Sequence, residues 1–385
     1  MTRRADVAVI GAGIVGLATA DALARRGASV VCVDGGLPGN GQSAGAARGF
    51  RHLHADPALT RLAVASREGW RRWEERAGAE LLERGGALRL GADVEPEVAA
   101  LREAGVEARV LTRAETDARL PWLAPEAGPL LFDPLAGALR AGPAFRALTG
   151  FLGDRLLRAR VEAIDALGGA GGVRLVTSAG DVACERCVVC AGAGTERLVA
   201  PLGITIDRER RAALRLTFRV RVPAEGAAPV WADRSGRFGE TAYGTPDGPG
   251  RYAVGLQETT LELEDAEAEA VPGAAADVRA ARRRLMAYVR AAFPGLEPHP
   301  VDAVLRLTTP LRGLGDDAFG LWERDGVLAF AGHNLFKHAP RLGDLLADAA
   351  LGAEPDPLLR PSAASAGRAR RSSSAPARTD GRRRR

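Results

Sequence analysis

The stretch "VAVIGAGIVG", residues 7–16, decides the fold expected of this chain. A short β-branched run, from Asp6 to Ile10, leads into the glycine pattern, and an alanine-rich segment follows as far as Arg26. A glycine loop between a strand and a helix is typical of a nucleotide-binding βαβ unit. The stretch therefore predicts an α/β fold that begins with a Rossmann-like domain.

Each glycine of the loop has a separate expected task. Gly11 permits the tight turn, Gly13 lets the backbone approach a pyrophosphate, and Gly16 lets helix and strand pack closely. The helix N-terminus then presents unpaired N–H groups to the phosphates. An acidic residue, Asp34, ends the next strand 23 residues after Gly11 and is placed to accept hydrogen bonds from an adenosine ribose. The pattern leaves NAD and FAD open and disfavours NADP, whose extra phosphate would meet Asp34.

Length and charge exclude some classes of protein. At 385 residues the chain exceeds the usual limit for one core, so two domains are expected. The net charge is +5, but the segment 361–385 holds eight Arg and one Asp, which leaves about −2 for the body. We therefore predict no nucleic-acid surface, and we expect residues 361–385 to form a disordered basic tail.

The remaining bulk features predict a cytoplasmic protein without a membrane span or a metal site. Four cysteines are too few for a disulfide scaffold. Three of them, Cys184, Cys187 and Cys190, have the spacing of metal ligands, but "CVVCAG" is typical of a buried strand. Residues three apart in a strand point to opposite faces, so we interpret these cysteines as small buried hydrophobes.

Four ordered motifs resemble a known family. The first follows Asp34 and carries Ser43 and then the pair Arg48 and Arg51. The others are "RVEAIDAL", "RCVVCAGAGTERLVAPLG" and "LAFAGHNLFKHAPRLGDLLADAALG". Together they resemble the D-amino-acid-oxidase superfamily of FAD enzymes, in particular the branch of sarcosine oxidase and N-methyltryptophan oxidase. The resemblance runs over most of residues 5–355.

This resemblance implies an α/β (α+β) architecture with two domains. It assigns residues 1–82, 147–215 and 313–358 to an FAD-binding domain of the glutathione-reductase type. Residues 83–146 and 216–312 form a substrate domain, whose alternating runs, such as "LRLTFRV", predict an antiparallel sheet. One helix is expected there from about Ala274 to Ala292. The acidic stretch 262–270 is interpreted as a solvated face or loop.

The resemblance also names the residues of a site. Arg51 and Lys337, the only lysine of the chain, correspond to the pair that holds a substrate carboxylate. Arg48 is expected near the isoalloxazine, and Tyr243 is expected to line the pocket or to pack in the core. Pro340 suits the first turn of a helix whose N-terminus faces the flavin. The predicted FAD contacts are Gly11, Gly13, Ile14, Val15, Gly16, Asp34, Gln42, Ser43, Arg48, Val161, Ala191, Gly192, Gly332, Asn334, Leu335, Phe336 and Lys337.

Three family features are absent from the sequence. The cysteine that attaches to FAD is replaced at Val304 or Leu305, so we predict dissociable FAD. The oxygen-activating lysine is replaced by Ala253, with Arg251 as a conceivable substitute, so slow oxidase turnover or another electron acceptor is expected. A family histidine is replaced by Ala44.

These observations predict an FAD-dependent oxidation of the C–N bond of an amine or N-substituted amino acid to an imine. Hydride leaves the α-carbon for flavin N5. The expected partners are a small amine or amino-acid-like substrate and O₂ or another acceptor, in a monomer or small homo-oligomer. Two alternatives stay open. One is oxidation of a 2-hydroxy acid or of an intermediate in specialised metabolism, and the other is a catalytically inactive flavin-binding protein.

Overall fold

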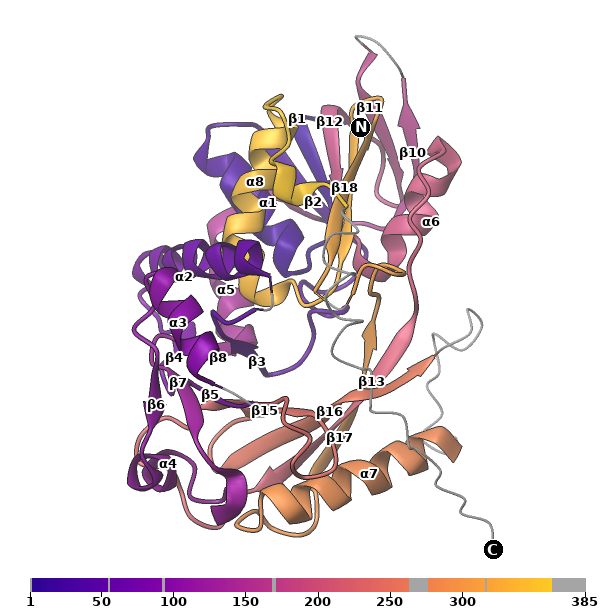
Figure 1. The fold of residues 1–385 in the computed structure, drawn as a ribbon. Coiled ribbons are helices and arrows are strands. Elements are labelled where there is room, and N and C mark those ends of the chain that lie inside the picture. The colour runs from indigo at the N-terminus through magenta and orange to yellow at the C-terminus, as the bar shows by residue number, and fades with distance from the viewer. Residues whose placement is uncertain are drawn as a thin grey trace, which may run out of the picture.

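The structure is a computed structural model that describes residues 2–54, 56–91, 94–167, 171–262, 276–315 and 317–361. The basic tail after residue 361 and most of the acidic stretch 262–270 lie outside the described residues. Two large sheets dominate the described part. The first contains the strand at the N-terminus and lies at the top of Figure 1, and the second lies at the bottom.

The first sheet is the predicted Rossmann-like layer. Its parallel strands run in the order β9 (Leu156–Arg158), β2 (Val30–Asp34), β1 (Arg3–Ile10), β12 (Val182–Val189) and β19 (Val327–Gly332). The antiparallel strands β10 (Val161–Ala166), β11 (Val173–Thr177) and β18 (Phe319–Arg324) extend it. β2, β19 and the second half of β1 are buried on both faces, and their sequences are therefore nearly continuous apolar runs.

Helices pack on the face of this sheet that Val7 and Val9 share. They are α1 (Ile14–Arg25), α2 (Pro57–Ala77), α5 (Ala141–Leu152) and α8 (Ala339–Ala350). The opposite face, with Ala8 and Ile10, packs against β10, β11 and the short helix α6 (Thr195–Val199). This alternation follows from the period of two in a strand.

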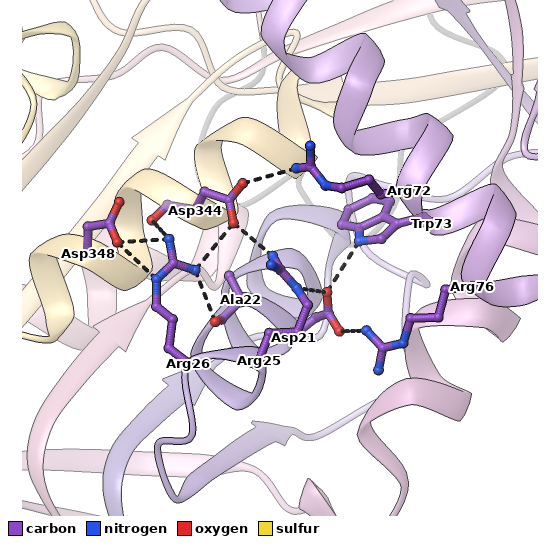
Figure 2. Close-up of polar contacts among 9 residues, drawn as sticks. All are labelled: Asp21, Ala22, Arg25, Arg26, Arg72, Trp73, Arg76, Asp344 and Asp348. Atoms are coloured by element: carbon purple, nitrogen blue, oxygen red, sulfur yellow. Dashed lines mark hydrogen bonds and ion pairs between the residues drawn. The ribbon is translucent and has the colours of Figure 1, made fainter.

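An ion-pair network around the buried Asp21 ties α1, α2 and α8 together (Figure 2). Asp21 on α1 is 1% exposed and accepts hydrogen bonds from Arg25 at 3.1 Å, Arg76 at 2.6 Å and the Trp73 indole at 3.2 Å. Arg25 also donates to Asp344 on α8 at 2.8 Å. One guanidinium thus joins the two helices whose N-terminal ends lie nearest the site described below.

The second sheet contains the strands that the residue alternation predicts. Its order is β17 (Asp302–Thr308), β13 (Arg211–Arg219), β16 (Arg251–Glu262), β15 (Ala242–Pro246), β14 (Val230–Asp233), β5 (Ala87–Leu90), β7 (Leu130–Asp133) and β6 (Arg109–Leu111). All neighbours are antiparallel except β14 and β5, which are parallel, so the sheet is mixed where an antiparallel one was expected. This pair joins two segments that are far apart in sequence, so no hairpin imposes an antiparallel course on it.

One face of the second sheet is covered by a helix and the other face is left for the site. Helix α7 (Ala276–Ala292) packs against Leu214, Leu216 and Phe218, the even-numbered residues of β13. The described part of this helix begins at Ala276, because residues 271–275 lie outside the described residues, and it ends at Ala292 as predicted. Helices α3 (Glu95–Glu103) and α4 (Arg113–Arg119) lie beside β6 and β7.

Two predicted domain boundaries need to move. The boundary at 146/147 would cut α5, which packs against α1, and the boundary at 215/216 would cut β13, which belongs wholly to the second sheet. A helix or strand packs as one unit, so these boundaries belong before Ala141 and before Arg211. A small sheet of β3 (Ala47–Phe50), β8 (Gly137–Arg140) and β4 (Leu82–Glu83) joins the two layers. The division into a cofactor domain and a substrate domain stays a prediction.

Candidate active site

A cavity of about 1020 Å³ opens between the two sheets. The glycine loop after β1 and the segment 33–53 form one wall, and the exposed face of β13, β15 and β17 forms the other. The turn 332–337 closes one end. The volume lies at the upper end of the range usual for ligand pockets, roughly 300–1,000 Å³.

The predicted site residues converge on this cavity. All of them line it except Gly16, although they come from six segments of the chain. Gly16 lies behind the loop, where an added Cβ would come 1.9 Å from the carbonyl oxygen of Gly11. Gly16 therefore serves the close packing of helix and strand that the motif predicts. The chemical roles of the others stay predictions.

The glycine loop fits a dinucleotide. Gly11 has φ +101°, and a Cβ there would lie 2.4 Å from the carbonyl oxygen of Cys190. At Gly13 a Cβ would meet only the Ser43 hydroxyl, at 3.4 Å, which is an ordinary contact. Protein packing thus requires glycine at Gly11, whereas Gly13 leaves backbone open to the cavity. That is the cradle which a pyrophosphate needs beside a helix N-terminus.

Two side chains hold this cradle in place. Asp34 accepts hydrogen bonds from the backbone N–H of Ala12 at 2.6 Å and of Gly36 at 2.7 Å. Ser43 accepts one from the N–H of Ile14, the first residue of α1, at 3.2 Å. A carboxylate has about four acceptor positions, so Asp34 keeps capacity for a ribose hydroxyl.

The middle of the cavity is fixed by Gln42 and Arg48. Gln42 donates to the Thr309 hydroxyl at 3.0 Å, which joins the segment after β2 to the end of β17. Arg48 donates to the carbonyl oxygens of Gln42, at 3.1 Å, and Ala44. Its guanidinium lies 5.5 Å from the centre of the Phe336 ring, and its buried Nε has no partner among the described residues. Arg48 therefore bridges the predicted pyrophosphate end and the turn before α8.

Lys337 lies at the far end in a group of charged and ionisable side chains. It is 4% exposed, and its ammonium donates to the carbonyl oxygen of Asn334 at 3.1 Å. Its Nζ also lies 3.7 Å from a carboxylate oxygen of Asp317, whose other oxygen lies 3.6 Å from Nδ1 of His54. The ring of His338 lies 5.2 Å from that of His54. Sequence reasoning did not single out Asp317.

Burial and charge set the protonation states in this group. Burial lowers the pKa of Lys337 to about 8, with Arg51 adding to the effect and Asp317 opposing it. Burial opposes ionisation of Asp317, but Lys337, His54 and Arg51 together hold its pKa well below the usual range. Burial, and next the Lys337 charge, lowers the pKa of His54 to about 4 and that of His338 well below its ordinary value. At neutral pH the group therefore holds two cations, one anion and two neutral imidazoles.

Arg51 is the cation of this group with spare hydrogen-bonding capacity. Within the described residues, no hydrogen bond or ion pair engages its guanidinium, which lines the cavity. Burial lowers its pKa, and the charge of Asp317 opposes that change. Five donor N–H groups in a planar fork suit a bound carboxylate.

The second sheet contributes residues that sequence reasoning missed. Tyr243 was expected either to line the pocket or to pack in the core, and it lines the cavity. Its ring lies over Gly255, where an added Cβ would come 2.4 Å from the phenol oxygen. Arg215 on β13 and Arg306 on β17 also line the cavity. An arginine between two leucines of a strand, as in "LRL" at both places, is a signal that was available. The alternation would put such an arginine opposite the core face.

The predicted departures have different outcomes. Arg251 is exposed and does not line the cavity, so its proposal as a substitute cation was wrong. Ala253 is fully buried. Among the cysteines, Cys190 reaches the cavity, but at the glycine loop, and burial raises its thiol pKa to about 12. Cys184 and Cys187 are buried in β12, as predicted.

Comparison with known protein families places the chain in one of them. The family model of FAD dependent oxidoreductases (DAO) matches residues 6–349. The chain belongs to this family, and its cofactor is FAD. The glycine cradle, Asp34 and the turn 332–337 are the residues of this structure that suit it. No helix in the described part of the chain is long and apolar enough to cross a membrane.

The chain is also similar to individual proteins, in sequence to one and in fold to others. Monomeric sarcosine oxidase of Bacillus sp. (strain B-0618) is 28% identical over 219 residues, which are 54% of this chain and 56% of that protein. The match thus spans little more than half of that curated relative. NikD, described as an unusual amino acid oxidase essential for nikkomycin biosynthesis, shares the fold with a TM-score of 0.79, 23% identity and coverage of 94% and 98% of the two chains. Glycine oxidase from Geobacillus kaustophilus does so with a TM-score of 0.72, 22% identity and coverage of 92% and 96%.

Proposed function

We propose that the protein oxidises the C–N bond of an N-substituted amino acid to an imine, with Arg51 and Lys337 holding the substrate carboxylate. The observation that carries the proposal is the group at the far end of the cavity. Arg51 and Lys337 bring two positive charges there, and Asp317 brings one negative charge. The net charge of about +1 suits one carboxylate and opposes an ammonium.

This charge balance also favours the reactive form of the substrate. An amine must have its nitrogen lone pair free before hydride can leave the α-carbon. A site that is already cationic favours the neutral amine over the ammonium, because like charges repel in a poorly solvated cavity. No strong base is then required, which agrees with the low pKa of His54 and His338. Bound FAD supplies the two-electron acceptor.

In this proposal, the residues that line the cavity position the substrate and the cofactor. Arg51 and Lys337 fix the carboxylate, and Tyr243 forms part of the opposite wall on β15. Arg48, stacked near Phe336, is assigned to the isoalloxazine. The electron acceptor is O₂ or another oxidant. A place in specialised metabolism is part of the proposal, motivated by the fold shared with NikD.

The test is an anaerobic titration of the purified protein followed by flavin absorbance. N-methylalanine and other N-methyl amino acids are expected to bleach the FAD, whereas lactate and other 2-hydroxy acids leave it oxidised. Bleaching by the hydroxy acids alone would assign the enzyme to C–O oxidation. Failure of every amine and every hydroxy acid, with FAD bound, would favour a catalytically inactive flavoprotein.

A further inference from the structure

Two arginines lie side by side on the cavity face of the second sheet. Arg215 of β13 pairs with Val304 of β17, and Ala213 of β13 pairs with Arg306 of β17. Arg215 and Arg306 are therefore diagonal neighbours on one face, at a distance that long side chains bridge easily. Both line the cavity.

Neither guanidinium has a counter-ion among the described residues. Arg215 is 5% exposed and has no hydrogen bond or ion pair there, and Nε and Nη1 of Arg306 are buried without a partner. Burial lowers the pKa of Arg306. Arg89, on the same face of the sheet, shows the usual arrangement, since Glu97 accepts its hydrogen bond at 2.6 Å. A buried and a half-buried cation at neighbouring positions without an anion are costly.

The nearby acids and hydroxyls do not meet this need. Asp247 accepts a hydrogen bond from the Thr217 hydroxyl at 2.7 Å, and Asp302 accepts one from the N–H of Ala303 at 2.8 Å. Tyr243, in contrast, adds a donor. In the register of the sheet, Gly255 pairs with both Tyr243 and Arg215, so the phenol above Gly255 lies in the same row as Arg215. The charge of Arg215 acts on Tyr243 and opposes the rise of its pKa that burial causes.

We propose that Arg215 and Arg306, assisted by the Tyr243 hydroxyl, form a second anion subsite that binds an acidic group on the side chain of the substrate. The inference rests on the proposed function and narrows it to amino acids with a second carboxylate. Arg51 and Lys337 hold the carboxylate of the amino-acid backbone, and the second subsite holds the carboxylate of the side chain. The small sheet that leads to Arg51 packs against β15, two strands from β13, which is ~10 Å at the usual strand spacing. The long side chains of both groups line one cavity, so we expect one extended diacid to contact both groups.

The experiment measures binding of non-oxidisable acids to the FAD-loaded protein through the change in flavin absorbance. Glutarate is expected to bind at least about tenfold more tightly than pentanoate, which has the same chain length and one carboxylate. Arg215→Gln and Arg306→Gln should each reduce this ratio toward one without weakening pentanoate. Arg215→Lys should keep part of the ratio. Arg160→Gln, which removes an exposed arginine from the rim at the opposite end of the cavity, is the matched control and should leave the ratio unchanged.

Several outcomes would overturn the subsite. A glutarate-to-pentanoate ratio near one in the unmodified protein would do so, as would a ratio that survives Arg215→Gln. A lower FAD content of Arg306→Gln, with an unchanged ratio in the molecules that keep FAD, would assign Arg306 to the cofactor. Thermal unfolding and FAD content show whether each variant is folded. Flavin bleaching separates the subsite from the proposed amine oxidation. If N-methylalanine bleaches the FAD but N-methylglutamate is not preferred over N-methylglutamine, the subsite alone is rejected.

Discussion

The two ends of the cavity are built in different ways. At the glycine loop, the polar groups are satisfied by backbone, because Asp34 and Ser43 each accept N–H groups of the loop and of α1. At the far end and on the second sheet, the polar groups are charged side chains, several of which lack partners in the described part of the protein. The shape of the first end is fixed by hydrogen bonds to the backbone, whereas the second end presents charged side chains to the cavity.

This difference indicates which end of the cavity binds the cofactor and which end selects the substrate. A backbone cradle recognises phosphates and tolerates little change, so it identifies a cofactor class. A group of buried charges is sensitive to the number and position of anions on the ligand. We therefore expect the glycine-loop end to recognise the cofactor and the charged end to select the substrate.

The largest expected effect separates two glycines of the same loop. Gly11→Ala places a Cβ 2.4 Å from the Cys190 carbonyl oxygen at φ +101°, so it should destabilise the fold by about 3 kcal/mol or more. Gly13→Ala meets no such contact and should fold normally but bind FAD weakly. Thermal unfolding and flavin content measure both. Equal stability of the two variants would show that the loop does not pack as described.

A second prediction concerns the carboxylate end. Arg51→Gln and Lys337→Met should weaken the binding of N-methylalanine by about 100-fold, because each removes a buried partner of the carboxylate. In Arg51→Gln the FAD content should stay close to that of the unmodified protein, since Arg51 is predicted to contact substrate rather than cofactor. Titration of flavin absorbance gives the affinity. An unchanged affinity in Lys337→Met would return this lysine to a structural role.

A third prediction tests the network that holds α1, α2 and α8. Asp21→Asn should lower the free energy of unfolding by about 2 kcal/mol, because it leaves buried hydrogen bonds of Arg25, Arg76 and Trp73 incompletely paired. Substrate affinity per FAD-loaded molecule should not change. Denaturant unfolding measures the effect. Asp348→Asn, at a half-exposed ion pair with Arg26, is the control with a small expected effect.

The fourth prediction is a pH dependence. The ammonium of Lys337, with a pKa of about 8, loses its charge above that pH, so carboxylate affinity should fall as the pH rises through about 8. Asp317 raises the pKa of Lys337, and Asp317→Asn should therefore move the midpoint of the fall to lower pH. Asp302→Asn removes a charge from the same cavity without contacting Lys337. A shift of equal size in both variants would assign the effect to the general potential of the cavity.

The smallest effect concerns the attachment of the cofactor. Val304 and Leu305 offer no thiol, and the buried Cys190 thiol lies at the glycine loop. Acid precipitation should therefore release all FAD into the supernatant. Yellow colour that stays with the precipitate would contradict non-covalent binding.

The sequence predicted the glycine-loop end of the cavity better than the end with the charged side chains. The loop is specified by local spacing, so Gly11, Gly16 and Asp34 are placed where the motif expects them. The domain boundaries taken from the resemblance fall inside α5 and β13, because a resemblance in sequence does not show where a helix or strand begins and ends.

Asp317 was missed because it meets Lys337 only through tertiary structure, from a loop with no motif of its own. Arg215 and Arg306 are an intermediate case. The "LRL" pattern predicts a polar side chain on the face opposite the core, but only the strand register shows that the two arginines are neighbours.

The central claim is that the charged end of the cavity holds the carboxylate of an amine substrate beside FAD. The most direct measurement compares anaerobic flavin bleaching by N-methylalanine and by its amide, which lacks the carboxylate, in the unmodified protein and in Arg51→Gln. The account predicts an affinity at least about 100-fold higher for N-methylalanine, and a difference that largely disappears in Arg51→Gln. Equal affinity for the acid and the amide in the unmodified protein would contradict it.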